Sequence, residues 1–277
     1  MGEITAQAVK AFREKTGLPF MDCKRALAEA GGDEAKAIEL LRKSGEKLEL
    51  KRAGRTTDFG RFGIFCGFDQ NVAAMVELKC ESAPVAQNEE FIQLANDLAK
   101  QLALGPGAET PEELLEQPSP SKDGMTLGEQ KADLFNRIRE VFNVGQMVRI
   151  EGTCGGYSHN AKTVAGVLLE VEGGDEQAAK DVCMHIAAMR PQVLSIEALD
   201  PQEVNKEREI LREAALKEGK PENIVDKMVE GRLRNFYAER VLLEQPFVKE
   251  EKITVGKFAK QNKMKINRFV HWELGKT

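Results

Sequence analysis

The stretch FGIFCGFDQNVAAMVEL, residues 62–78, marks the point where the chain changes from helical to strand periodicity. Residues 62–68 and 72–78 are rich in aromatic and aliphatic side chains, and the turn-forming cluster Asp69-Gln70-Asn71 separates them. We therefore predict two paired strands joined by a hairpin.

Helical patterns follow this hairpin. Apolar residues recur at three- to four-residue spacing across residues 89–104, which predicts an amphipathic helix, and residues 127–142 are predicted to form a second one. The segment between them, 105–124, is rich in Pro, Gly, Ser and Glu, and we expect a surface loop there. This order of strands and helices is typical of a small α+β domain.

A similar layout recurs farther along the chain. Strands are predicted at 148–152 and 164–171, a helix at 176–189 and a closing strand at 266–274. We therefore interpret the core as a duplicated α+β unit.

The first residues have a different, wholly helical pattern. We predict three short helices, opened by Thr5, Asp22 and Asp33, with Ser44-Gly45 ending the third and a basic linker after it.

A further helical unit interrupts the second half of the core. Residues 201–243 are mostly charged with sparse apolar positions, and Gly219-Lys220-Pro221 divides them, which predicts an antiparallel helical hairpin projecting into water. The predicted organisation is thus a three-helix domain with linker at 1–54, a first core subdomain at 55–142 and a second at 143–277 that contains the hairpin.

Composition limits the possible partners. A net charge of -5 argues against a nucleic-acid binder, because neutralising phosphates requires a basic surface. No apolar run approaches the roughly 18 residues of a membrane span, and the first residues show no signal peptide. The five cysteines are widely spaced, as expected of reduced thiols, so we predict a cytoplasmic protein without a membrane or nucleic-acid partner.

The sequence carries no recognisable catalytic or cofactor signature. The chain has no phosphate-binding loop of the Gly-x-x-x-x-Gly-Lys-Ser/Thr type, and no set of His, Cys, Asp or Glu has metal-ligand spacing. A cysteine hydrolase that pairs Cys80 or Cys183 with His159 stays open as an alternative, whereas His185 is interpreted as a packed core histidine. We expect a binding protein with no cofactor, no metal and no small-molecule substrate of its own.

Four groups of residues resemble the elongation factor Ts family and follow the family's order along nearly the whole chain. They are Ile4-Thr5-Ala6 with Met21-Asp22-Cys23-Lys24-Arg25-Ala26-Leu27; Gly155-Gly156-Tyr157-Ser158-His159; Gly219-Lys220-Pro221 with Lys227-Met228-Val229-Glu230-Gly231-Arg232; and Gln245-Pro246-Phe247-Val248 with Thr254-Val255-Gly256.

The resemblance implies a ubiquitin-associated-like fold for residues 1–54 and a role as a guanine nucleotide exchange factor. Members of the family bind elongation factor Tu carrying GDP, disturb its Mg²⁺ and phosphate site, and so release GDP during translation elongation. No bond is made or broken, so the resemblance implies that the chain is not an enzyme.

One segment departs from the family pattern. The family has Cys-Gln-Thr-Asp-Phe-Val-Ala after the second core strand, and its phenylalanine pushes into elongation factor Tu near the Mg²⁺ site. The same place here reads Cys80-Glu81-Ser82-Ala83-Pro84-Val85-Ala86. The resemblance places the Mg²⁺-disturbing contact at Ser82, Ala83, Pro84 and Val85, without the aromatic ring.

Two interpretations of this departure stay open. Pro84 is either a smaller, rigid wedge matched to its partner, or a simple contact while other surfaces drive exchange. A third alternative is a diverged member that binds and stabilises elongation factor Tu with weak exchange. Thr57-Asp58-Phe59 repeats the missing tripeptide, but we interpret it as the entry to the first strand.

The resemblance also implies contacts outside this segment. It places further contacts with elongation factor Tu at Lys24, Val144, Gly145, Tyr157, His159 and Val248. Longer members add a C-terminal helical module, and we expect the contact that it makes to be absent here.

Overall fold

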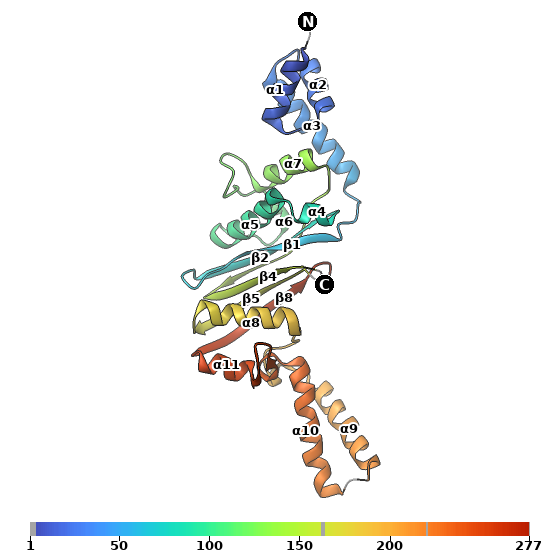
Figure 1. The fold of residues 1–277 in the computed structure, drawn as a ribbon, viewed down its shortest axis with the longest axis vertical. Coiled ribbons are helices and arrows are strands. Elements are labelled where there is room, and N and C mark those ends of the chain that lie inside the picture. The colour runs from blue at the N-terminus through green and yellow to red at the C-terminus, as the bar shows by residue number, and fades with distance from the viewer. Residues whose placement is uncertain (1–3, 162–163, 220, 277) are drawn as a thin grey trace.

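The computed structural model describes residues 4–161, 164–219 and 221–276. Lys220, which belongs to the predicted hairpin turn, lies outside the described residues, as do residues 1–3 and 277 at the ends of the predicted domains. The described chain is elongated, with a three-helix module at one end, two stacked sheets in the middle and a helical hairpin at the other end (Figure 1). This combination of helices and small sheets confirms the predicted α+β fold class.

The N-terminal module consists of α1 (Ala6–Thr16), α2 (Phe20–Glu29) and α3 (Glu34–Arg52). The Thr5 hydroxyl caps α1 by accepting a hydrogen bond from the Ala8 N–H at 3.2 Å. The apolar faces of the three helices meet in a small core, whose larger members are Val9, Phe12, Leu18, Leu27 and Leu41.

Two predicted boundaries in this module are wrong. α2 begins at Phe20 rather than at Asp22, because Pro19, with a φ of -58°, already sets the backbone for a helix start. α3 continues through Ser44-Gly45 to Arg52. Its last turns pack Leu48 against the core of the sheet domain, and this tertiary contact outweighs the weak helix propensity of glycine.

The first half of the core is an antiparallel sheet in the order β1-β2-β3. Helix α5 packs directly on the outer face of this sheet, and α7 packs on α5. The bounds of α5 match the predicted range, because Asn88 caps the helix and its apolar stripe fills the core. The short α6 lies within the predicted surface loop. The bounds are β1 (Phe59–Phe65), β2 (Val72–Cys80), α4 (Ala83–Ala86), α5 (Glu89–Leu104), α6 (Pro111–Leu115), α7 (Leu127–Ile138) and β3 (Asn143–Glu151).

The second half repeats this arrangement with a sheet in the order β4-β5-β8. Helix α8 packs on its outer face, and α11 with the small β6-β7 hairpin closes the core. The bounds are β4 (Cys154–Asn160), β5 (Val164–Gly173), α8 (Glu176–Met189), β6 (Pro246–Phe247), β7 (Glu250–Thr254), α11 (Val255–Gln261) and β8 (Met264–Glu273).

The middle of the core differs from the predicted layout in two ways. Strand β4 was not predicted, because the sequence CGGYSHN has no alternating apolar pattern. It forms because all of its residues pair with residues 164–170 of β5. Strand β3 hydrogen-bonds to β2, so it belongs to the first sheet although residues 143–151 were assigned to the second subdomain. A division by hydrogen-bonded sheets therefore extends the first half to Glu151.

The two sheets pack face to face (Figure 1). Phe62 and Met75 from the first sheet meet Leu168 and Trp272 from the second, and the rings of Phe62 and Trp272 lie 6.3 Å apart. Gly166 of β5 lies directly beneath Phe62 and Met75: a Cβ there would stand 2.5 Å from the Met75 sulfur and 2.7 Å from Phe62 Cγ. The close approach of the sheets thus depends on a missing side chain.

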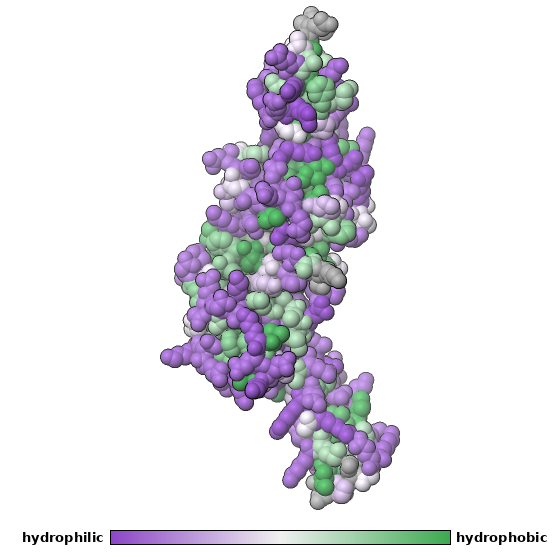
Figure 2. Space-filling model, viewed as in Figure 1, coloured by the Kyte–Doolittle hydropathy of each residue, from purple (hydrophilic) through white to green (hydrophobic). Residues whose placement is uncertain are grey.

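The predicted helical hairpin consists of α9 (Pro201–Lys217) and α10 (Glu222–Arg240) and projects away from the sheets (Figure 1). Its own small core contains Ala215, Val225, Val229 and Leu233. Hydrophobic patches nevertheless remain on its surface, as Figure 2 shows.

Within the described residues, no helix has both the length and the apolar character needed to cross a membrane.

His185 is fully buried in α8 and joins it to the β6-β7 segment. Its Nδ1 accepts a hydrogen bond from the Val248 N–H at 3.1 Å, so Nε2 carries the proton and donates to Gln245 Oε1 at 2.9 Å. Burial lowers the pKa of His185, which keeps the ring neutral at physiological pH. The interpretation of His185 as a packed core residue agrees with these contacts.

The contact between the sheets predicts the effect of filling the space at Gly166. A Gly166→Ala substitution forces Phe62 and Met75 apart and should lower the free energy of unfolding by roughly 1–3 kcal/mol. Gly231→Ala is the matched control, because Gly231 lies inside α10 with open space around it. That substitution should raise helix stability by about 0.5–1 kcal/mol. Urea unfolding of both variants checks the pair, and a Gly166→Ala protein as stable as the unmodified one would contradict close sheet packing.

Candidate partner-binding site

The segment Ser82–Val85 follows β2 and forms the start of α4, rather than an open loop. Ser82 occupies the N-cap position with extended backbone angles, and Pro84 lies in the first turn, where a fixed φ and a missing N–H are tolerated. Both polar groups of Ser82 donate to the Glu140 carboxylate: its N–H at 3.0 Å and its hydroxyl at 2.6 Å. One carboxylate therefore fixes the entry to the turn.

The far end of the same turn is also fixed. The Ala86 carbonyl accepts a hydrogen bond from the Arg61 guanidinium at 3.0 Å. Glu81, just before the turn, accepts from the Val141 N–H at 2.8 Å and from Arg55 at 3.0 Å. Burial acts to raise the pKa of Glu81, but these two hydrogen bonds outweigh it and lower the pKa, so the carboxylate stays ionised.

The turn presents a small apolar surface to solvent. Ala83 and Pro84 are exposed, whereas Val85 is half-buried against the first core and Ala86 is buried. Two small side chains are thus displayed on a backbone that is held from both ends.

Val144 and Gly145 lie in β3, next to the end of β2 that leads into the turn. Val144 packs against the first core. A Cβ on Gly145 would collide with the carboxylate of Glu77, which is 5% exposed. That carboxylate accepts from the Gln146 N–H at 3.3 Å and the Gly275 N–H at 3.2 Å. A glycine at 145 is therefore required by packing inside the chain, whatever binds outside.

Tyr157 and His159 lie in strand β4. The Tyr157 hydroxyl and His159 Nδ1 are 2.9 Å apart and share a hydrogen bond. Tyr157 also packs against the second core, so part of its side chain has a structural role.

The cysteine-hydrolase alternative finds no support in this geometry. His159 is engaged by Tyr157, and burial raises the pKa of Cys80 to about 12. Burial also raises the pKa of Cys183 well above its usual value. A thiolate nucleophile is therefore disfavoured at both cysteines at neutral pH. Across residues 4–161, 164–219 and 221–276, no cluster of three His, Cys, Asp or Glu residues could hold a metal ion.

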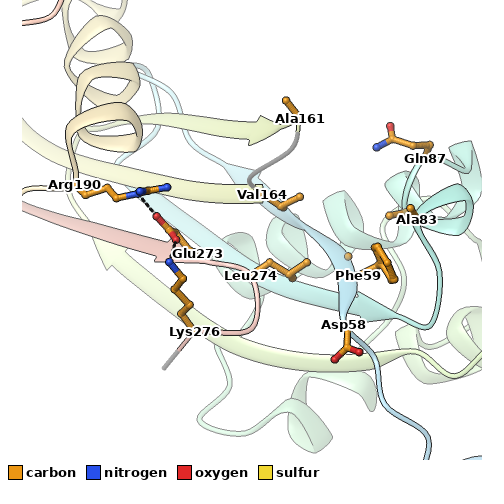
Figure 3. A pocket seen from close by; sticks show the side chains of 12 residues that line it. Asp58, Phe59, Ala83, Gln87, Ala161, Val164, Arg190, Glu273, Leu274 and Lys276 are labelled. Atoms are coloured by element: carbon orange, nitrogen blue, oxygen red, sulfur yellow. Dashed lines mark ion pairs between the residues drawn. The ribbon is translucent and has the colours of Figure 1, made fainter.

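A cleft of about 420 Å³ opens beside the turn, between the two halves of the core. Figure 3 shows Phe59 and Ala83 at one side of this cleft and a charged group, Arg190, Glu273 and Lys276, at the other. Glu273 pairs with both cations. The hydrogen bond from Lys276 and the charge of Arg190 hold its pKa below the usual value despite burial.

Sequence reasoning missed most of this cleft. The tripeptide Thr57-Asp58-Phe59 was the one available signal, and it was interpreted as a strand entry. Arg190 and Glu273 carry no sequence signal, because their meeting depends on how α8 ends beside β8.

Lys24 and Val248 lie apart from the turn. Lys24 is exposed on α2 of the N-terminal module, and Val248 is 44% exposed in the β6-β7 turn, where His185 holds its N–H. The structure therefore gathers Ser82–Val85 and Val144-Gly145 at one end of the first sheet, and leaves these two contacts on separate parts of the molecule.

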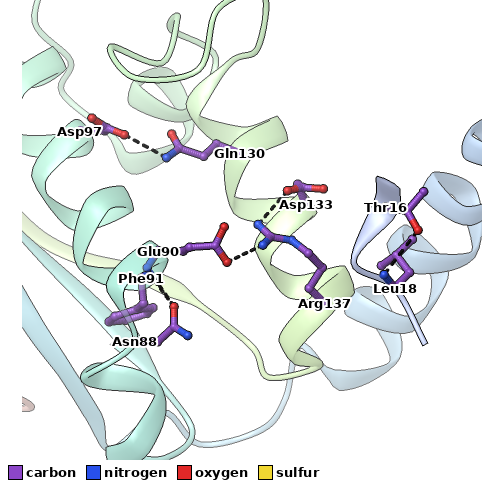
Figure 4. A network of polar contacts seen from close by, with 9 residues as sticks. All are labelled: Thr16, Leu18, Asn88, Glu90, Phe91, Asp97, Gln130, Asp133 and Arg137. Atoms are coloured by element: carbon purple, nitrogen blue, oxygen red, sulfur yellow. Dashed lines mark hydrogen bonds and ion pairs between the residues drawn. The ribbon is translucent and has the colours of Figure 1, made fainter. Parts of the chain in front are cut away.

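A polar joint sets the position of the module that carries Lys24. Arg139 pairs with Asp22 at 2.7 Å across the joint. Beside it, Arg137 of α7 pairs with Glu90 of α5 and with Asp133, as Figure 4 shows. A second cleft, of about 530 Å³, lies along this joint and has a strongly charged lining.

Comparison with known proteins identifies the relatives of this chain. A family model described as elongation factor TS matches residues 84–276. The elongation factor Ts of Thioalkalivibrio sulfidiphilus (strain HL-EbGR7) is 43% identical over 277 residues, covering 98% of this chain and 92% of the relative. That of Azoarcus sp. (strain BH72) is 42% identical over 278 residues, covering 99% and 92%. That of Methylococcus capsulatus (strain ATCC 33009 / NCIMB 11132 / Bath) is 40% identical over 275 residues, covering 98% and 92%.

These matches extend over nearly the whole chain and confirm the resemblance drawn from the sequence motifs. The chain belongs to the elongation factor Ts family of translation elongation factors.

Proposed function

We propose that this protein is a guanine nucleotide exchange factor that binds elongation factor Tu carrying GDP and promotes release of the GDP. It acts by disturbing the Mg²⁺ and phosphate site of its partner, makes and breaks no covalent bond, and needs no cofactor. Its partner is elongation factor Tu in the cytoplasm, with no nucleic acid, membrane or small-molecule substrate of its own.

The observation that carries this proposal is the exposed turn Ser82–Val85 on a fixed backbone. Glu140 holds its start and Arg61 holds its end, so Ala83 and Pro84 are presented in one conformation. A contact that is already ordered loses little conformational entropy on binding, and more of its interaction energy remains available to distort the partner.

The proposal includes further contacts with elongation factor Tu outside the turn. They spread the interface over the N-terminal module, the sheets and the β6-β7 turn, so that one part can anchor the partner while the turn acts on its nucleotide site. They are Lys24, Val144, Gly145, Tyr157, His159 and Val248.

Exchange of this kind is a linkage between two ligands of elongation factor Tu. If the factor lowers the affinity of Tu for GDP, then GDP lowers the affinity of Tu for the factor by the same ratio. Release of GDP therefore requires a contact that fits the nucleotide-free partner better than the GDP-bound one.

A second candidate function rests on the small side chains of the turn. Ala83 and Pro84 do not fill the volume of an aromatic anchor, which carries ~2 kcal/mol or more at many interfaces. A protein with only these residues at the nucleotide site could bind and stabilise elongation factor Tu with weak exchange. A GDP release rate that does not rise when the protein is added would favour this function.

Release of fluorescent GDP from the chain's own elongation factor Tu, followed by stopped flow, tests the proposal. The unmodified protein should accelerate release. Glu140→Ala frees the start of the turn by removing two charge-assisted hydrogen bonds, each worth ~1.5–3 kcal/mol. We therefore expect the acceleration of GDP release to fall by roughly fivefold or more. Glu172→Ala, which removes an exposed carboxylate on the second sheet, is the matched control and should change nothing. Equal rates for Glu140→Ala and the unmodified protein would show that a fixed turn is not needed.

The composition of the turn can be tested by restoring the bulk that it lacks. In the double variant Ala83→Asp with Pro84→Phe, the phenylalanine ring adds volume at a contact where elongation factor Tu is proposed to accommodate only Ala83 and Pro84. GDP release should therefore slow several-fold. The same stopped-flow measurement with the chain's own elongation factor Tu checks this. An unchanged rate would remove any special role for residues 83 and 84.

A further inference from the structure

Phe59 is a large aromatic residue that the fold leaves exposed. Its side chain is 44% exposed, although it is the first residue of β1 and pairs with Cys80 in register. Single exposed apolar residues are common and need no explanation. Phe59 differs because of what lies next to it.

The ring lies on the same side of β1 as the Ser82–Val85 turn. Side chains two residues apart on a strand share a face, so Phe59 and Arg61 point the same way. Arg61 reaches the Ala86 carbonyl at the end of α4, which places that face of β1 against the turn. Figure 3 shows the Phe59 ring beside Ala83 at the edge of the cleft.

The cleft has an apolar side and a charged side without net charge. Phe59, Ala83, Val164 and Leu274 supply apolar surface from β1, α4, β5 and the end of β8. The charged lining consists of two acids and two bases, Asp58, Glu273, Arg190 and Lys276, whose formal charges cancel. A phosphate or a cation would therefore gain little here, whereas an apolar side chain would gain burial.

The backbone that carries the ring is fixed. The register of β1 against β2 holds residue 59, and the Asn143 amide donates to the Thr57 hydroxyl at 3.1 Å just before the strand. An aromatic ring on such a support can act as an anchor, because aromatic residues are common at interface hot spots and a strand positions a side chain more precisely than a loop does.

We propose that Phe59 and the Ala83–Pro84 turn form one contact surface for the nucleotide-binding domain of elongation factor Tu, in which the Phe59 ring supplies the bulk that the turn lacks. This inference rests on the proposed function. It also continues the proposed interface, because Ala83 belongs both to the turn and to the wall of the cleft. The occupant of the cleft is an apolar side chain of elongation factor Tu next to its nucleotide site.

The test measures release of fluorescent GDP from the chain's own elongation factor Tu. Phe59→Ala should reduce the acceleration by roughly tenfold or more, as expected on loss of an aromatic hot spot. Phe59→Trp, which keeps a large ring, should retain most of it. Leu104→Ala is the matched control: Leu104 is 53% exposed at the end of α5, roughly 24 Å along the helix from the turn, and should leave the rate within twofold.

Folding is controlled by a second substitution and by urea unfolding. Phe59→Thr removes the ring and introduces a β-branched residue, which suits a strand. Its unfolding midpoint should match that of the unmodified protein while its exchange activity falls as for Phe59→Ala. Loss of activity only in variants whose midpoint also falls would overturn the proposal, because it would assign Phe59 a structural role.

The remaining outcomes separate this inference from the proposed function. If the unmodified protein accelerates GDP release and Phe59→Ala and Phe59→Thr do so equally well, the role of Phe59 is refuted and exchange stands. If the unmodified protein does not accelerate release, the proposed function fails. If the free protein is a dimer that Phe59→Ala converts to a monomer, a second copy of this chain occupies the cleft, and the proposal is overturned.

Discussion

The face-to-face packing of the two sheets is the contact on which the rest of this molecule depends. It is close because Gly166 offers no side chain to Phe62 and Met75, and Trp272 closes the same layer. Glu77 adds a polar link, since its buried carboxylate accepts hydrogen bonds from the Gln146 N–H in β3 and from the N–H of Gly275, two residues after the end of β8. With the sheets packed together, the start of β1, the turn after β2 and the end of β8 meet around one cleft.

The proposed interface follows from this arrangement. Ala83 of the turn and residues of the second half line the same cleft, and the sheet contact keeps these two sides together. Charged side chains hold the structure in place around the contact, through Glu140, Arg61 and the Arg190–Glu273 pair. The surface proposed to contact the partner, Phe59 with Ala83 and Pro84, is apolar and small. This division lets charged groups order the backbone while apolar groups bind.

The elements with strong local signals could be predicted from the sequence. Helix α5 has a capping asparagine and a regular apolar stripe, and the α9-α10 hairpin has charged faces around a narrow apolar seam, so both were predicted. Strand β4 lacks any such signal and exists because β5 pairs with it. The partner of β3 could not be predicted either, since pairing across some 70 intervening residues depends on the whole fold. In the site, the turn was identified through the family pattern. The position of Phe59 beside the turn follows from strand register, so it could not be predicted from the sequence.

The central claim is that this protein loosens GDP by fitting the nucleotide-free form of elongation factor Tu better than the GDP-bound form. The most direct test is to measure the dissociation constant of the complex twice, once with nucleotide-free elongation factor Tu and once with saturating GDP and Mg²⁺. Linkage predicts that GDP weakens the complex by the same factor by which this protein weakens GDP binding. Equal dissociation constants in the two conditions would contradict the account, because a partner that binds both forms equally cannot shift the equilibrium between them.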